Sequence, residues 1–162
     1  MSIVFNAEEI FDLAILIEKN GAAFYKKAAD NMSDAGIKDI LTQLVDMEID
    51  HERTFIELKN ELVPADKEQT TFDPYEELAL YLKAFADGHV FDLSDPSASL
   101  TGNESGVDIL KKAIGLEKDA IVLYLGLKDL IPANLGQDKI DKIISQEMGH
   151  IRLLSGKLKD LV

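Results

Sequence analysis

The chain has 162 residues, of which 46% are hydrophobic and only four are proline, so it is long and apolar enough for a single globular domain spanning residues 1–162. It has no cysteine, which excludes disulfides, thiolate zinc sites and iron–sulfur clusters. Its net charge of −13 disfavours binding to nucleic acid or to an anionic membrane, and neither a secretory signal nor a membrane-spanning run is evident, so we expect a soluble cytoplasmic protein.

Apolar residues recur with helical spacing through the first third of the chain. One amphipathic helix is expected to start at Asn6, which forms a capping-box pattern with Glu9. A second helix, capped by Ser33, is expected to end before Pro64, because proline cannot continue a helix. The tight turn between the two helices predicts an antiparallel hairpin over about residues 5–62.

A crossover over residues 63–104 is expected to contain a short helix at 74–88. One side of this helix is apolar and must be buried against the bundle or against a second subunit, so we predict a homodimer. His89 has no acidic residue at ligand spacing, and we expect it not to bind metal. Two further helices, separated near Pro132, predict a second hairpin over about 105–162. The fold class is therefore all-α, an antiparallel four-helix bundle of two hairpins joined by a long crossover, which is the ferritin-like arrangement.

The two hairpins repeat one pattern at a constant offset of 99 residues. In each hairpin the first helix carries Glu-Lys and, seven residues after the glutamate, a tyrosine; the second helix carries Glu-x-x-His-x-Arg. Residues three apart share a helix face, so each Glu-x-x-His pair can reach one point in the bundle core. The matched residues are Glu18 and Glu117, Tyr25 and Tyr124, Glu48 and Glu147, His51 and His150, and Arg53 and Arg152.

The four repeated glutamates fall on the apolar sides of their helices, which we expect to include Met47 and Met148 as well. Burying a carboxylate in the core without a partner costs several kcal/mol of folding free energy, so we expect a compensating positive charge. Two divalent cations balance four carboxylates, and neutral imidazoles complete the coordination without adding charge. This donor set suits iron or manganese and tolerates zinc. We therefore predict a two-metal centre ligated by Glu18, Glu48, His51, Glu117, Glu147 and His150.

The remaining residues of the repeat each have two interpretations. Tyr25 and Tyr124 are either ordinary core tyrosines or catalytic residues that donate a hydrogen bond to a ligand carboxylate across the bundle. Arg53 and Arg152 lie two residues past each histidine, so they point away from it. They form salt bridges at the surface or at the end of the bundle, or else they support the charge of the site.

Both hairpins resemble the rubrerythrin-like branch of the ferritin-like superfamily, and residues 65–100 do not take part in this resemblance. It is carried by residues 17–25, 48–52, 116–119 and 146–150. The resemblance implies a carboxylate-bridged di-iron site that reacts with peroxide or dioxygen. By the same resemblance, the bridging carboxylates are Glu48 and Glu147, the terminal ones Glu18 and Glu117, and the nitrogen ligands His51 and His150.

The implied function is that of an oxidoreductase that uses two iron ions (Fe2+/Fe3+), with manganese or zinc as other occupants, to reduce hydrogen peroxide or dioxygen. Ala120 stands where classical rubrerythrins carry a further glutamate. Because no cysteine is present for a rubredoxin-like centre, the electrons must come from a separate donor protein. Two alternatives stay open: an iron-handling ferroxidase or storage module, and a helical module in which the metal is structural.

Overall fold

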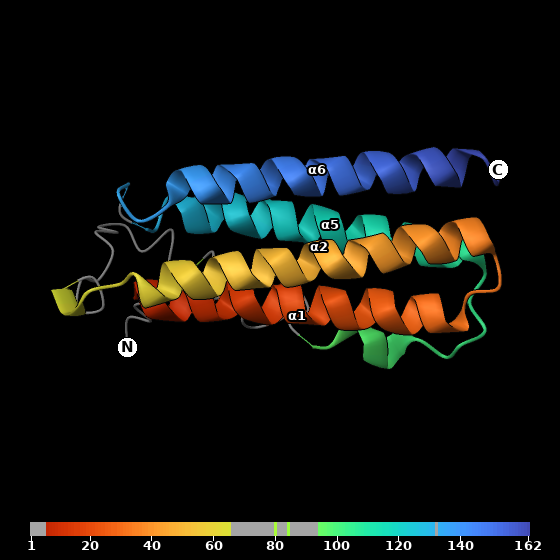
Figure 1. Ribbon diagram of the computed structural model, residues 1–162, viewed down its shortest axis with the longest axis horizontal. Coiled ribbons are helices and arrows are strands. Elements are labelled where there is room, and N and C mark those ends of the chain that lie inside the picture. The colour runs from red at the N-terminus through yellow and green to blue at the C-terminus, as the bar shows by residue number, and fades with distance from the viewer. Residues whose placement is uncertain (1–5, 66–79, 81–83, 85–93, 132) are drawn as a thin grey trace.

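The computed structural model describes residues 6–65, 80, 84, 94–131 and 133–162. Within these residues the chain forms no strand. Its four long helices lie side by side (Figure 1), which confirms the predicted all-α four-helix bundle. None of the helices in the described part of the chain is long and apolar enough to cross a membrane. The elements are α1 (Ala7–Asn31), α2 (Ala35–Asn60), the 3-10 helix η1 (Pro96–Ser99), α5 (Gly106–Lys128) and α6 (Gln137–Lys159).

Each long helix packs mainly against its neighbour in the sequence. α1 packs on α2 across the short connection 32–34, and α5 packs on α6 across 129–136, so each pair is an antiparallel hairpin. The chain then crosses from one hairpin to the other, and η1 on this crossover packs against α1 (Figure 1). The short helix expected at 74–88 lies outside the described residues except for Leu80 and Ala84, and His89 lies outside them as well.

The starts of α1 and α2 are marked by polar side chains. Asn6 caps α1 and forms the predicted capping box with Glu9. α2 is capped by Asp34 and not by Ser33, since the Asp34 carboxylate accepts a hydrogen bond of 2.8 Å from the backbone N–H of Ile37. The predicted cap is therefore wrong by one residue. Aspartate and serine cap helices about equally well, so composition alone does not decide between two adjacent candidates.

Two apolar clusters, one toward each end of the bundle, form the core. The first cluster joins the starts of α1 and α6 to the ends of α2 and α5, and it includes Phe11, Phe55 and Leu123. The second cluster joins the opposite ends of the same helices, and it includes Phe24 and Leu110. A layer of buried glutamate and histidine side chains lies between them. The bundle therefore holds this polar layer between two packed ends.

Met47 and Met148 are 42% and 50% exposed, contrary to the expectation that they face the core. Each precedes or follows a buried glutamate, Glu48 or Glu147, in the sequence. Successive residues of an α-helix point about 100° apart around the axis, because one turn takes 3.6 residues. The orientation that brings each glutamate inward therefore carries its methionine neighbour to the surface.

Two leucines of α5 test how this helix is buried. Leu110 is fully buried in the second cluster, so Leu110→Ala should lower the free energy of unfolding of the metal-free protein by about 2–5 kcal/mol. Leu125 is 50% exposed, so Leu125→Ala on the same helix should change it by less than about 1 kcal/mol. Denaturant unfolding followed by circular dichroism gives both values. Equal losses would contradict the described orientation of α5.

Candidate metal centre

All six residues that the sequence predicts as metal ligands meet in the layer between the two apolar clusters. Their exposed fractions are 5% or less. All four helices of the bundle contribute, the first helix of each hairpin with a glutamate and the second with a Glu-x-x-His pair one turn apart. α1 provides Glu18, α2 provides Glu48 and His51, α5 provides Glu117, and α6 provides Glu147 and His150.

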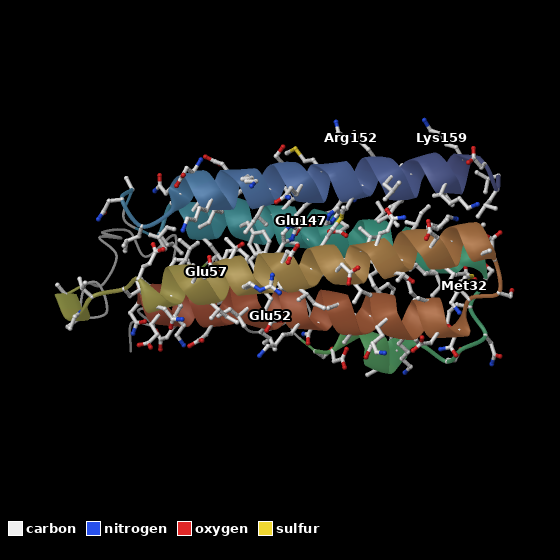
Figure 2. All side chains as sticks on the ribbon, viewed as in Figure 1. Met32, Glu52, Glu57, Glu147, Arg152 and Lys159 are labelled. Carbon is white, nitrogen blue, oxygen red and sulfur yellow. The ribbon has the colours of Figure 1, made fainter. Side chains whose placement is uncertain are left out.

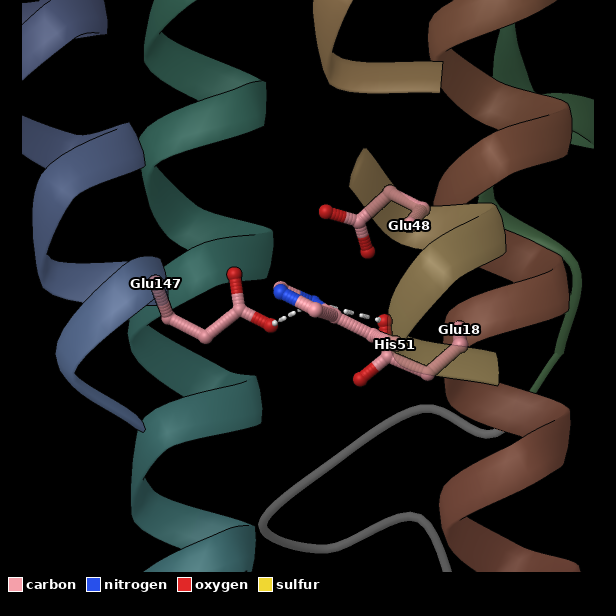
Figure 3. Close-up of side chains that lie close together, drawn as sticks. All are labelled: Glu18, Glu48, His51 and Glu147. Carbon is pink, nitrogen blue, oxygen red and sulfur yellow. Dashed lines mark ion pairs between the residues drawn. The ribbon is translucent and has the colours of Figure 1, made fainter. Parts of the chain in front are cut away.

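Each histidine points its Nδ1 atom at glutamate oxygens of the site, His51 at oxygens from other helices and His150 also at Glu147 of its own helix. His51 Nδ1 lies 3.0 Å from Glu147 Oε1 and 3.5 Å from Glu18 Oε2 (Figure 3). His150 Nδ1 lies 2.8 Å from Glu147 Oε2 and 3.3 Å from Glu117 Oε1. The two imidazole rings are stacked, with centroids 5.5 Å apart and planes 16° from parallel. Nδ1 is therefore the ring nitrogen that faces the position where a cation would lie.

The ligand atoms form two overlapping groups, and within each group they lie within 4.8 Å of one another. Two glutamates belong to both groups and so are placed to bridge two cations, whereas each histidine and each remaining glutamate belongs to one group. This sharing matches the bridging and terminal roles that the family resemblance implies. The His51 group consists of Glu18, Glu48, His51 and Glu147, and the His150 group consists of Glu48, Glu117, Glu147 and His150.

Several polar atoms of these groups are buried without a hydrogen-bond partner in the described part of the chain. Such an atom costs about 1–3 kcal/mol if nothing compensates it. Carboxylate oxygens and imidazole nitrogens are donors that iron, manganese and zinc accept, so the residues present fit two divalent cations. The atoms are Glu18 Oε2, Glu48 Oε1, His51 Nδ1, both Glu147 Oε atoms and His150 Nδ1.

Burial and mutual repulsion shift the charges of the site. Burial raises the pKa of Glu48 well above its ordinary range, and the neighbouring charges of Glu18 and Glu147 add to the effect. Burial by itself would lower the pKa of His51, but the contacts with Glu147 and Glu18 outweigh it and raise that pKa to about 10. The pKa of His150 is raised to about 10 by equivalent glutamate contacts against the same effect of burial. Without cations the site therefore holds protons, which metal binding would displace.

A tyrosine from each apolar cluster donates a hydrogen bond to this layer. Tyr25 Oη donates to Glu117 Oε1 at 2.5 Å, and Tyr124 Oη donates to Glu18 Oε1. The hydrogen bonds expected across the bundle are therefore present, and each connects one hairpin to the other. Burial, reinforced by the nearby carboxylates, raises the pKa of both tyrosines well above 10.0, so both hydroxyls keep their protons.

Gly21 lies directly against the Glu48 carboxylate. A Cβ atom built on Gly21 would lie 2.8 Å from Glu48 Oε2, closer than non-bonded atoms approach, so a side chain there would displace the carboxylate. The sequence pattern does not single out Gly21. Only its position could have pointed to it, because Gly21 follows Glu18 by about one turn of α1 and matches Ala120 in the second hairpin at the 99-residue offset.

The two arginines of the repeat lie away from the buried layer. Arg53 Nη1 is 2.7 Å from Asp50 Oδ1, and both side chains are exposed, so this is a surface ion pair on α2. Figure 2 shows Arg152 projecting from the outer side of α6. Neither arginine supports the charge of the site by direct contact, and exposed pairs of this kind contribute about 0–1 kcal/mol to stability.

Replacing both shared glutamates tests whether the layer binds metal. In the parent protein, Zn2+ at 100 times its Kd should raise the free energy of unfolding by about 2.7 kcal/mol. The double variant Glu48→Gln/Glu147→Gln should lose this gain, because it removes the two carboxylates that belong to both ligand groups. The readout is denaturant unfolding with and without Zn2+.

Glu57→Gln is the matched control, since Glu57 is an exposed glutamate of α2. It should keep the full stabilisation by Zn2+. A gain that is unchanged in the double variant would show that the metal binds elsewhere.

No known family and no curated protein matches this sequence. Among solved structures, the chain is similar to a protein from Thermotoga maritima that is described as a candidate ferritin-like diiron-carboxylate protein. The TM-score is 0.72 at 22% sequence identity, and the match covers 98% of each chain. A likeness at this identity concerns the fold. Over nearly its whole length, the chain therefore has the ferritin-like fold that its repeated hairpins predict.

Proposed function

We propose that the protein is a non-haem di-iron oxidoreductase that reduces hydrogen peroxide or dioxygen. The proposal is carried by the two overlapping ligand groups that share Glu48 and Glu147. Helical bundles that present one glutamate from each of two helices and Glu-x-x-His from each of the other two hold pairs of iron or manganese ions. The description of the similar Thermotoga maritima protein as a diiron-carboxylate protein supports iron over manganese or zinc.

Reduction of hydrogen peroxide to two molecules of water consumes two electrons and two protons, and a pair of iron(II) ions would supply the two electrons and polarise the oxygen–oxygen bond. The chain would supply the donor atoms that hold both cations. Glu48 and Glu147 belong to both ligand groups, and the two histidines add donor atoms without adding negative charge. The apolar clusters on both sides keep bulk water away from the layer.

Tyr25 and Tyr124 are both fully buried but have different surroundings. The Tyr25 side chain lines a small cavity together with Glu48 and Glu117, whereas Tyr124 packs beside Phe55. Both tyrosines hold a glutamate oxygen in place by a hydrogen bond. We assign to Tyr25 the additional role of offering its hydroxyl oxygen as a hydrogen-bond acceptor to hydrogen peroxide in that cavity, since its single O–H is donated to Glu117.

The reaction needs a source of electrons outside this chain. The chain has no cysteine with which to bind an iron–sulfur centre, so we propose a separate electron-donor protein. The homodimer predicted from the apolar side of residues 74–88 also stays a prediction, and light scattering at micromolar concentration tests it.

The reaction is tested by mixing anaerobic protein, loaded with two equivalents of Fe2+, with hydrogen peroxide in a stopped-flow instrument. A two-electron reaction should oxidise two Fe2+ per peroxide without releasing hydroxyl radicals. It should be faster than the reaction of Glu48→Gln/Glu147→Gln protein given the same Fe2+, and Glu57→Gln should behave as the parent. Oxidation at the rate of the double variant, or one Fe2+ per peroxide with radical release, would refute the proposal.

The two tyrosines provide a second test. Tyr25→Phe and Tyr124→Phe should each weaken metal binding by about 10- to 100-fold, because each removes a hydrogen bond to a glutamate of the site. A chelator competition titration measures this loss. At saturating Fe2+, Tyr25→Phe should also slow oxidation by peroxide, whereas Tyr124→Phe should leave its rate close to that of the parent. Equal rates in the two variants would rule out the special role of Tyr25.

A further inference from the structure

A cavity of about 30 Å³ lies between α1 and α5 and reaches the polar layer. Its floor is formed by the buried side chains of Tyr25, Glu48 and Glu117. Its rim is formed by partly exposed residues, among them Leu116 on α5 and Pro96 in η1. The cavity therefore connects the solvent side of the α1–α5 face with two carboxylates of the candidate metal centre.

The cavity exists because two of the residues that face it are small. Gly21 and Ala120, which match each other in the two hairpins, face the cavity from α1 and α5. A side chain at position 21 would collide with Glu48, and a larger one at position 120 would grow into the same space. Ala120 is 6% exposed, so its methyl group faces the buried part of the cavity.

On the opposite face, the groove formed by the described residues does not reach the glutamates of the site. A larger groove of about 370 Å³ lies between α2 and α6, and its lining includes His51, Thr54 and Gln146 but none of the four buried glutamates. His51 turns its Nδ1 atom away toward Glu147 and Glu18, so a molecule in this groove meets the imidazole ring and not the ligand atoms.

The two ligand groups are not equally accessible from the cavity. Glu117, which lines it, belongs only to the His150 group, and Glu48 belongs to both groups. Glu18, which belongs only to the His51 group, does not line it. A molecule that enters between α1 and α5 therefore meets the side of the site where the His150 group lies.

We propose that the α1–α5 cavity is the entry and binding site for an external ligand of two or three heavy atoms, such as peroxide, dioxygen or azide, at the His150 group alone. The size follows from the volume, because one water-sized group needs about 10–15 Å³ and the cavity offers about 30 Å³. Gly21 and Ala120 set this limit. The inference rests on the metal centre of the proposed function and not on its reaction.

The probe is azide, added to protein that carries two equivalents of Co2+, and the readout is the change in the visible absorption of Co2+. The parent should bind one azide per two Co2+. Ala120→Val should weaken azide binding by about tenfold or more, because the added methyl groups occupy space that azide needs. Leu116→Trp narrows the rim from a partly exposed position and should weaken it in the same direction, whereas Leu116→Ala should not weaken it.

Thr54→Leu, which fills the α2–α6 groove, is the control and should bind azide within about twofold of the parent, since it leaves the cavity untouched. The amount of bound Co2+ is measured in every variant. If Ala120→Val binds less Co2+ than the parent, Leu116→Trp becomes the test. Azide binding that is unchanged in both narrowed variants, two equal azide sites, or a loss in Thr54→Leu would each overturn the inference. Because Co2+ does not undergo the peroxide reaction, a failure of that reaction with Fe2+ refutes the proposed function separately.

Discussion

Four carboxylates share the buried centre of a helical bundle, and the rest of the structure is arranged around that concentration of charge. A single ionised group in such a place costs several kcal/mol, about as much as a domain's whole stability margin, unless it is paired. Here the partners within reach are two histidines, two tyrosine hydroxyls and the proton that burial retains on Glu48. These partners leave lone pairs directed at the space between them. Cations bound there would lower the cost of the layer, and their binding would be coupled to folding.

The polar layer is held from both ends of the molecule. Tyr25 belongs to the second apolar cluster and Tyr124 to the first, and each hydroxyl reaches across to a glutamate of the other hairpin. The orientation of Glu18 and Glu117 is thus tied to how well the two cores pack. The two hairpins differ at the α1–α5 face. Gly21 and Ala120 occupy matching positions but differ by one methyl group, and η1 packs mainly against α1. A near-symmetric ligand set is in this way presented to solvent from one side.

The residues explain which features could be predicted from the sequence. The bundle, the hairpins and the meeting of the six site residues follow from the helical period and the 99-residue repeat, because an α-helix converts sequence spacing directly into a face. The helical period of the apolar residues alone predicts that Met47 faces inward, but its neighbour Glu48 occupies the inward position. The choice of Asp34 over the adjacent Ser33 as the cap of α2 depends on one hydrogen bond, from the backbone N–H of Ile37 to Asp34. The cavity depends on side-chain packing between helices about a hundred residues apart, which spacing along one helix does not encode.

The division of the core into two apolar clusters has a consequence for how the molecule opens. Proteins open in cooperative units that correspond to contiguous packed regions. Each cluster here packs one end of all four helices, and the contacts that join the two ends pass through a layer of charged groups whose mutual attraction depends on what lies between them. With the layer neutralised, the two ends share one continuous interior and open together. With its negative charges uncompensated, repulsion within the layer would weaken the connection between the two ends, and each end would open with its own free energy.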